Sequence, residues 1–257
     1  MNILQSLILG IVEGLTEFLP ISSTFHLIVS SKIMGLSSTE FLKLFEVVIQ
    51  SGAIFALVFI YGKTLLTDKK ILTNVIYSFI PTALVGFILH KIIKNVFFES
   101  NGLMLSVFVG MGILFLVIEK YSLFLTKKCE TLTTKQAILI GLAQACSVVP
   151  GVSRAGSVIV AMMFMGYKRD EAAKYTFLLS LPTIFAASAL DLYQGRELLL
   201  SLTDGWLILG IGALSALISA YLVMTWFTRY LATHTLKIFG WYRLVIAAGL
   251  VLFKVLP

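Results

Sequence analysis

Long apolar runs separated by short polar segments occupy most of the 257-residue chain. A helix that crosses a bilayer needs about 20 mostly apolar residues, and six runs reach that length. Their content of Leu, Ile, Ala, Phe and Gly favours helix over strand. The predicted membrane-spanning helices are Phe41–Tyr61, Ile71–Ile92, Leu103–Leu125, Tyr175–Tyr193, Trp206–Phe227 and Ile238–Leu256.

Two further apolar regions, Ile3–Met34 and Ala137–Met165, are each interrupted by a proline and several polar residues. Each region is too broken to form one span, and each half is too short to cross a bilayer. We therefore predict two re-entrant pairs, each made of a half-helix, a proline-containing turn and a second half-helix. Irregular backbone is tolerated at membrane depth only where protein or a water-filled cavity surrounds it, so both turns should lie inside the bundle.

The two interrupted regions match each other when the chain is shifted by 131 residues, so that Ser22 meets Ser153, or by 130 residues, so that Pro20 meets Pro150. We interpret the match as a duplication within a single membrane domain, with repeat 1 at about 1–125 and repeat 2 at about 135–257. An odd number of spans per repeat inverts the second copy relative to the first, as in inverted-repeat transporters. The predicted fold class is all-α: a polytopic membrane protein with six spanning helices and two re-entrant helix pairs.

The composition agrees with a membrane protein. Of all residues, 58% are hydrophobic and 13% are charged, whereas soluble domains have about 45–50% and about 25%, so an ordinary soluble enzyme is excluded. The net charge of +7 comes largely from one set of loops, which include Lys63, Lys70, Lys127 and Arg169. The positive-inside rule explains this charge without a nucleic-acid partner and makes the Lys-rich side cytoplasmic. Both termini and the first re-entrant pair are then expected to open outward, and the second pair inward.

Two carboxylates are predicted inside the membrane. Glu13 and Glu17 are four residues apart and therefore share one face of the first half-helix. Ionisable groups in a membrane are costly and usually face a cavity. The pair suits general acid–base catalysis, a cation site or both. The alternative is a pair of interfacial glutamates near a helix end.

Three hydroxyl residues, Ser22, Ser23 and Thr24, follow Pro20 at the expected start of the second half-helix. A helix N-terminus is a ready anion site. Ser23 is either a nucleophile activated by a neighbouring base or a helix cap, and the residues alone leave both open. His26 lies three residues later, on the same predicted helix face, where it could donate or accept a proton; the alternative is a satisfied buried histidine.

The second turn carries Arg154 between two apolar runs. An arginine in the membrane costs several kcal/mol unless it meets an anion, which would be Glu13, Glu17 or a ligand phosphate. Glycines in the turn permit close backbone approach. The two turns together suit phosphoryl transfer better than conduction. The residues expected to bind the substrate are Ser22, Thr24, Gly151, Ser153 and Gly156.

The segments EGLTEFLPISST at 13–24 and PGVSR at 150–154 resemble the two signature regions of the undecaprenyl-diphosphatase, or bacitracin-resistance, family. The resemblance covers nearly the whole chain. It implies hydrolysis of undecaprenyl diphosphate to undecaprenyl phosphate and inorganic phosphate, which recycles the carrier lipid of cell-wall synthesis and confers bacitracin resistance. Bacitracin would compete by sequestering this polyprenyl substrate. The resemblance implies catalytic roles for Glu13, Glu17, Ser23, His26 and Arg154.

The same resemblance implies a divalent cation, magnesium or calcium, at Glu13 and Glu17. It also implies a multi-pass protein of the bacterial inner membrane with its site open to the periplasm. Two positions depart from the family pattern: Phe25 replaces a usual Gly and is expected to crowd the site, and Ala155 replaces a frequent Ser and removes a phosphate donor. The alternative function is a transporter or flippase for an ion or a lipid phosphate. The oligomeric state, including a homodimer, is left open.

Overall fold

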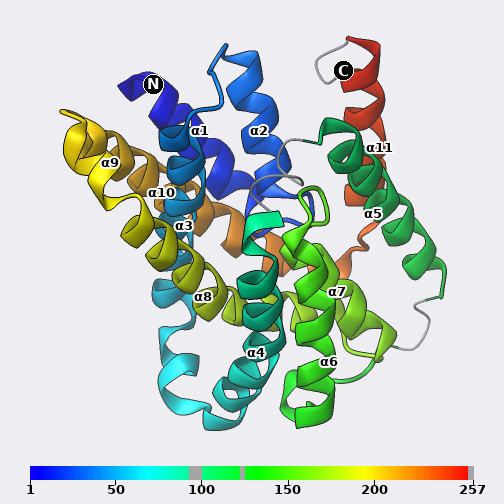
Figure 1. The fold of residues 1–257 in the computed structure, drawn as a ribbon. Coiled ribbons are helices and arrows are strands. Elements are labelled where there is room, and N and C mark those ends of the chain that lie inside the picture. Colours follow the sequence, from blue (N-terminus) through cyan, green and yellow to red (C-terminus); the bar gives the residue numbers. More distant parts are fainter. Residues whose placement is uncertain (93–99, 122–124, 254–257) are drawn as a thin grey trace.

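Helices account for nearly all of the regular structure. The computed structural model describes residues 1–92, 100–121 and 125–253, and this part contains no strand (Figure 1). In chain order the helices are α1 (Ile3–Thr16), α2 (Ser23–Ile33), α3 (Glu40–Thr67), α4 (Lys69–Ile92), α5 (Asn101–Tyr121), α6 (Thr134–Ala145), α7 (Arg154–Phe164), α8 (Arg169–Gln194), α9 (Arg196–Ser201), α10 (Gly205–Thr233) and α11 (Lys237–Leu252). Short 3-10 turns, η2 (Cys129–Thr131) and η3 (Cys146–Val148), precede and follow α6.

Five of these helices, α3, α4, α5, α8 and α10, are long and apolar enough to cross a membrane. They correspond to five of the six predicted spans, and the all-α polytopic class is confirmed. The predicted span Ile238–Leu256 corresponds to α11, which has 16 residues in the described part, fewer than the roughly 20 that a full span needs. Residues 122–124 and 254–256, which the predictions placed at the ends of two spans, lie outside the described residues.

The two interrupted regions form pairs of short helices, α1 with α2 and α6 with α7, as predicted. At 14 and 12 residues, α1 and α6 are about 21 and 18 Å long, less than the roughly 30 Å hydrocarbon core. In Figure 1, α1 and α2 occupy the upper half of the bundle, and α6 and α7 the lower half. The turns that end α1 and α6 therefore point toward the middle from opposite ends, as an inverted repeat requires. The boundaries of the repeats stay a prediction.

Matching details mark the two pairs. Each begins with a capping box, formed at Asn2 for α1 and at Thr133 for α6. Each turns through a serine in the left-handed region, Ser22 with φ 69° and Ser153 with φ 70°, and within the described ranges no other residue except glycine has positive φ. Such backbone costs about 1–3 kcal/mol and persists only where its surroundings enforce it.

Close backbone contacts hold the first half-helix of each pair against a spanning helix from the other half of the chain. α1 packs on α10, and α6 packs on α4. A Cβ at Gly10 would lie 2.3 Å from the Gly212 carbonyl oxygen, and one at Gly141 would lie 2.1 Å from that of Ser78. Small residues that permit such approach are the usual basis of helix association in membranes. The N-terminal and C-terminal halves of the chain are thus interleaved rather than placed side by side.

The end of the bundle that carries the predicted cytoplasmic loops is tied by polar contacts. The Glu119 carboxylate, near the end of α5, accepts from Arg169 Nε at 2.8 Å and from the Leu236 backbone N–H at 2.7 Å. Lys70 Nζ donates to the Glu130 carbonyl oxygen at 2.5 Å. These contacts join the end of α5 to the starts of α8 and α11, and the start of α4 to η2.

Candidate active site

A cavity of about 510 Å³ lies where the two re-entrant turns meet. Its volume is within the roughly 300–1,000 Å³ of typical ligand pockets. The polar residues that line it are Glu17, Ser22, Ser23, Thr24, Lys43, Gln50, Thr82, Ser147, Ser153, Arg154, Thr183 and Asp191. Apolar side chains of α4 and α8 complete the wall, among them Phe79, Phe87, Ile184 and Leu190. The cavity therefore places a polar floor next to an apolar wall.

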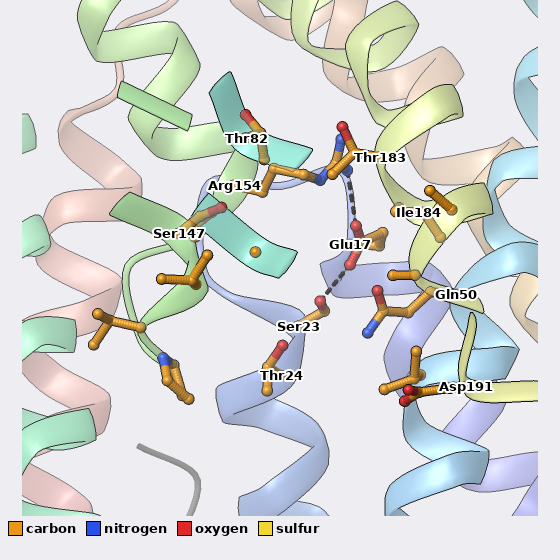
Figure 2. Close-up of a pocket in the computed structure, with 18 of the residues that line it drawn as sticks. Glu17, Ser23, Thr24, Gln50, Thr82, Ser147, Arg154, Thr183, Ile184 and Asp191 are labelled. Carbon is orange, nitrogen blue, oxygen red and sulfur yellow. Dashed lines mark hydrogen bonds and ion pairs between the residues drawn. The ribbon is translucent and has the colours of Figure 1, made fainter. Parts of the chain in front are cut away.

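Glu17 joins the two turns at the centre of this floor, as Figure 2 shows. One of its carboxylate oxygens accepts from Arg154 Nη2 at 2.8 Å, and the other accepts from the Ser23 hydroxyl. Arg154 also donates from Nη1 to the Thr176 carbonyl oxygen at 3.4 Å. Glu17 and Ser23 belong to the first re-entrant pair and Arg154 to the second, so a carboxylate, a hydroxyl and a guanidinium converge from both repeats.

The start of α2 keeps its capacity to bind an anion. Ser23 is the first residue of α2, and its hydroxyl is bonded to Glu17. Within the described chain, the N-cap residue Ser22 makes no side-chain cap hydrogen bond. The first-turn N–H groups of α2 are therefore not occupied by a cap. At the matching position of α7, Ser153 does accept from the Gly156 N–H at 3.2 Å, so Ser153 acts as a helix cap while also lining the cavity.

Glu13 lies one turn before Glu17 and is fully buried. Both of its carboxylate oxygens lack a hydrogen-bond partner among the described residues, and it interacts electrostatically with Glu17, Arg154 and Glu46. Glu13 does not line the cavity. A buried charge without a partner costs several kcal/mol, and one arginine cannot neutralise two carboxylates.

Because two buried carboxylates lie near one arginine, we asked whether a divalent cation would fit beside them. Magnesium is commonly held by one or two carboxylates together with substrate phosphates. Glu17 lines the cavity where a phosphate would bind, and the unpartnered oxygens of Glu13 lie one helical turn before it. Among the residues that the structure describes, no group of three or more His, Cys, Asp and Glu side chains could hold a metal by itself. The residues therefore fit a cation that the substrate helps to bind.

His26 is directed away from Ser23. Its Nδ1 lies 2.8 Å from the Ser22 carbonyl oxygen, and its Nε2 lies 2.8 Å from the Tyr242 hydroxyl. The imidazole also stacks on the Tyr242 ring and does not line the cavity. His26 was expected on the same helix face as Ser23, but its ring nitrogens contact other residues, and the side chain bonded to the Ser23 hydroxyl is the Glu17 carboxylate. A role for His26 as proton carrier stays a prediction.

Two glycines expected at the substrate differ in their placement. Gly151 lines the cavity with φ 101°, and a Cβ there would lie 2.5 Å from the Met104 carbonyl oxygen, so the turn requires glycine. Gly156 does not line the cavity. A Cβ on Gly156 would lie 2.7 Å from the Phe115 ring. The glycine therefore permits α7 to pack closely on α5 and does not present its backbone to a phosphate.

Phe25 does not crowd the site as expected. It is fully buried, and its ring stacks on Phe108 with centroids 3.8 Å apart, outside the cavity lining. Ala155 is likewise buried and outside the lining. Neither departure from the family pattern therefore changes the cavity wall.

One residue next to the turns was missed by sequence reasoning. Arg243 of α11 is fully buried and donates to carbonyl oxygens of both turns, those of Pro20 and Gly151, at 2.9 Å each. The signal was present, because an arginine interrupts the apolar run that was predicted as the last span.

Comparisons with known proteins place this arrangement in a family. The family described as Bacitracin resistance protein BacA matches residues 6–249. The undecaprenyl-diphosphatase of Aquifex aeolicus (strain VF5) is 42% identical over 247 residues, which cover 94% of each chain. The undecaprenyl-diphosphatase of Campylobacter fetus subsp. fetus (strain 82-40) is 40% identical over 253 residues, 96% of this chain and 97% of the relative. With the family match and these relatives extending over nearly the full length, the chain belongs to the bacitracin resistance protein BacA family.

Proposed function

We propose that this protein hydrolyses undecaprenyl diphosphate to undecaprenyl phosphate and inorganic phosphate. The observation that carries the proposal is the contact of Glu17 with both Ser23 and Arg154 inside a cavity bounded by apolar helices. The names of the relatives support the same reaction. The reaction would recycle the carrier lipid of cell-wall synthesis, and bacitracin would oppose it by sequestering the diphosphate.

The terminal phosphate lies between Arg154 and the N-terminus of α2, where a guanidinium and backbone N–H groups neutralise its charge. The Ser23 oxygen attacks the terminal phosphorus while Glu17 takes the hydroxyl proton. The bond from that phosphorus to the bridging oxygen breaks, and undecaprenyl phosphate leaves with the electron pair. Water then cleaves the phosphoserine and releases inorganic phosphate. Direct attack by water, with Ser23 only binding phosphate, is the competing route.

The lipid tail leaves the cavity between α4 and α8. The wall there consists of apolar and small side chains, including Phe79, Ala83, Phe87 and Leu190. Phe87 is 78% exposed, which places an aromatic ring where a membrane lipid would lie. The diphosphate can therefore reach the polar floor while the polyprenyl chain stays in the bilayer.

A divalent cation would be held by Glu13 and Glu17 and would supply charge neutralisation at the phosphate oxygens.

Purified protein in detergent should release inorganic phosphate from undecaprenyl diphosphate, and EDTA should abolish the release until magnesium or calcium is restored. Undecaprenyl phosphate, which has no anhydride bond, is the control substrate. Release that persists in EDTA contradicts the cation. If wild-type protein releases nothing with either cation present, the transporter or flippase alternative takes the place of the phosphatase.

The site opens to the outer face of the bacterial inner membrane. The cavity is lined by Lys43 and Gln50 near the start of α3 and by Asp191 near the end of α8. These helix ends lie opposite the Lys-rich loops, at the end of the bundle where α1 begins in Figure 1. By the positive-inside rule, that end is periplasmic.

This orientation predicts the outcome of a labelling experiment. In a variant without Cys129 and Cys146, a single cysteine at Asn2 should react with an impermeant maleimide from the periplasmic face, and one at Lys127 from the cytoplasmic face. The reason is that the two positions lie at opposite ends of the bundle. Labelling of both positions from one face would contradict the orientation.

A further inference from the structure

Arg243 is a buried cation without an acidic partner. Its side chain is 0% exposed, and no carboxylate in the described part of the chain forms an ion pair with it. Buried arginines are otherwise nearly always paired. The contacts that Arg243 makes must therefore offset an unusual desolvation cost.

Those contacts are backbone carbonyls of both re-entrant turns and of Phe108 in α5. Nε donates to the Pro20 oxygen and Nη1 to the Gly151 oxygen, each at 2.9 Å, and Nη1 also lies 3.3 Å from the Phe108 oxygen. The rings of Phe108 and Phe115 lie 4.6 and 5.3 Å from the guanidinium carbon. One planar group, fixed by two aromatic rings, thus joins the turn of repeat 1 to the turn of repeat 2.

The bridged carbonyls stand close to the reacting groups. Pro20 precedes Ser23 by three residues, and Gly151 precedes Arg154 by three. Between each carbonyl and its reacting group lies one of the two left-handed serines. Because strained backbone relaxes unless neighbours hold it, the bridge is well placed to hold both turns in their observed form.

We propose that Arg243 is a positioning residue for phosphate transfer, and this role rests on the proposed function. Its fork holds the two turns in register, so that Ser23 and Arg154 act on the same phosphate. A displacement of about 1 Å between reacting groups can lower a rate about a hundredfold, so the register of the turns determines turnover.

Arg243→Lys tests the bridge, because an ammonium keeps the charge but lacks the planar fork. The rate of phosphate release by folded protein should fall at least about tenfold. Arg169→Lys is the control: it weakens a partly buried arginine contact at the other end of the bundle, so it should lower thermal stability while the rate stays within about twofold of wild type. Wild-type turnover by Arg243→Lys overturns the bridge, and an equal rate loss in Arg169→Lys shows a merely structural role.

A double-mutant cycle with Arg154→Lys separates positioning from general damage. If Arg243 acts through Arg154, the double variant should be little slower than the slower single variant. Rate losses that multiply overturn the proposal. If Arg243→Lys does not fold, Phe108→Leu provides a second variant, because it removes one of the two rings that contact the guanidinium. Its rate of phosphate release should fall several-fold, and the loss should not multiply with that of Arg154→Lys. Rate losses that multiply in this second cycle would also overturn the positioning role. Absence of phosphate release by the wild type would overturn the proposed function as well, whereas an active wild type with an unaffected Arg243→Lys overturns only the positioning role.

Discussion

Glu17→Gln should lower the rate of phosphate release by about a thousandfold or more. Glu17 is the carboxylate that accepts from the Ser23 hydroxyl, and loss of a general base costs about 10²–10⁴ in rate. The same change removes the ion pair with Arg154, which leaves a partly buried guanidinium without its anion. The measurement is the initial rate of inorganic phosphate release by detergent-purified protein, normalised to the folded fraction.

Glu119→Gln is the matched control for this prediction. Glu119 is also a buried glutamate paired with an arginine, Arg169, but it lies at the far end of the bundle. Its neutralisation should lower the thermal midpoint and leave the rate within a few-fold of wild type. If Glu17→Gln turns over at a rate near that of Glu119→Gln, Glu17 is not the base.

Ser23→Ala should leave a folded protein whose phosphate release is lower by orders of magnitude. The hydroxyl is bonded to Glu17, and the N–H groups of the first turn of α2 adjoin it, so the residue has a base and a phosphate site beside it. Ser23→Thr keeps a hydroxyl and should retain part of the activity. The free energy of unfolding should fall by about 1.5–3 kcal/mol, the usual contribution of a hydrogen bond to a charged group.

Ser78→Ala provides the comparison for Ser23→Ala. Ser78 is a buried serine of α4 that donates to the Ala137 carbonyl oxygen at 2.6 Å outside the cavity lining. Its loss should cost similar stability without a comparable loss of rate. Near-normal hydrolysis by Ser23→Ala would assign the attack to water and leave Ser23 as a phosphate-binding group.

The meeting of Glu17, Ser23 and Arg154 could be predicted from the sequence because each interrupts an apolar run. Polar side chains at membrane depth are costly in contact with lipid, and a shared polar cavity gives all three of them polar partners. The half-helices could also be predicted from the sequence, because their apolar segments are too short to span a bilayer and adjoin a proline. Because polar atoms are costly in lipid, the polar residues that interrupt apolar runs indicate much of the site.

Contacts that depend on the backbone of the turns could not be predicted in the same way. His26 was expected beside Ser23 from ideal helical spacing, but Ser23 begins the helix, directly after the left-handed backbone of Ser22. That angle has no sequence signal in a serine, because L-residues rarely adopt it. Arg243 was visible as an arginine in an apolar run, yet its acceptors are main-chain carbonyls, which every residue possesses.

The packing of α1 on α10 also determines when the site can first exist during synthesis. α1 leaves the ribosome first, and its partner follows roughly 190 residues later. At about 5–20 residues per second this delay is about 10–40 s. Until α10 arrives, Gly10 and Gly14 have no helix to lie against, and the 14-residue α1 is too short to span the bilayer by itself. The N-terminal half-helix is therefore a late-docking element despite its early translation, and a chain truncated before α10 carries Ser23 but lacks the helix on which α1 docks.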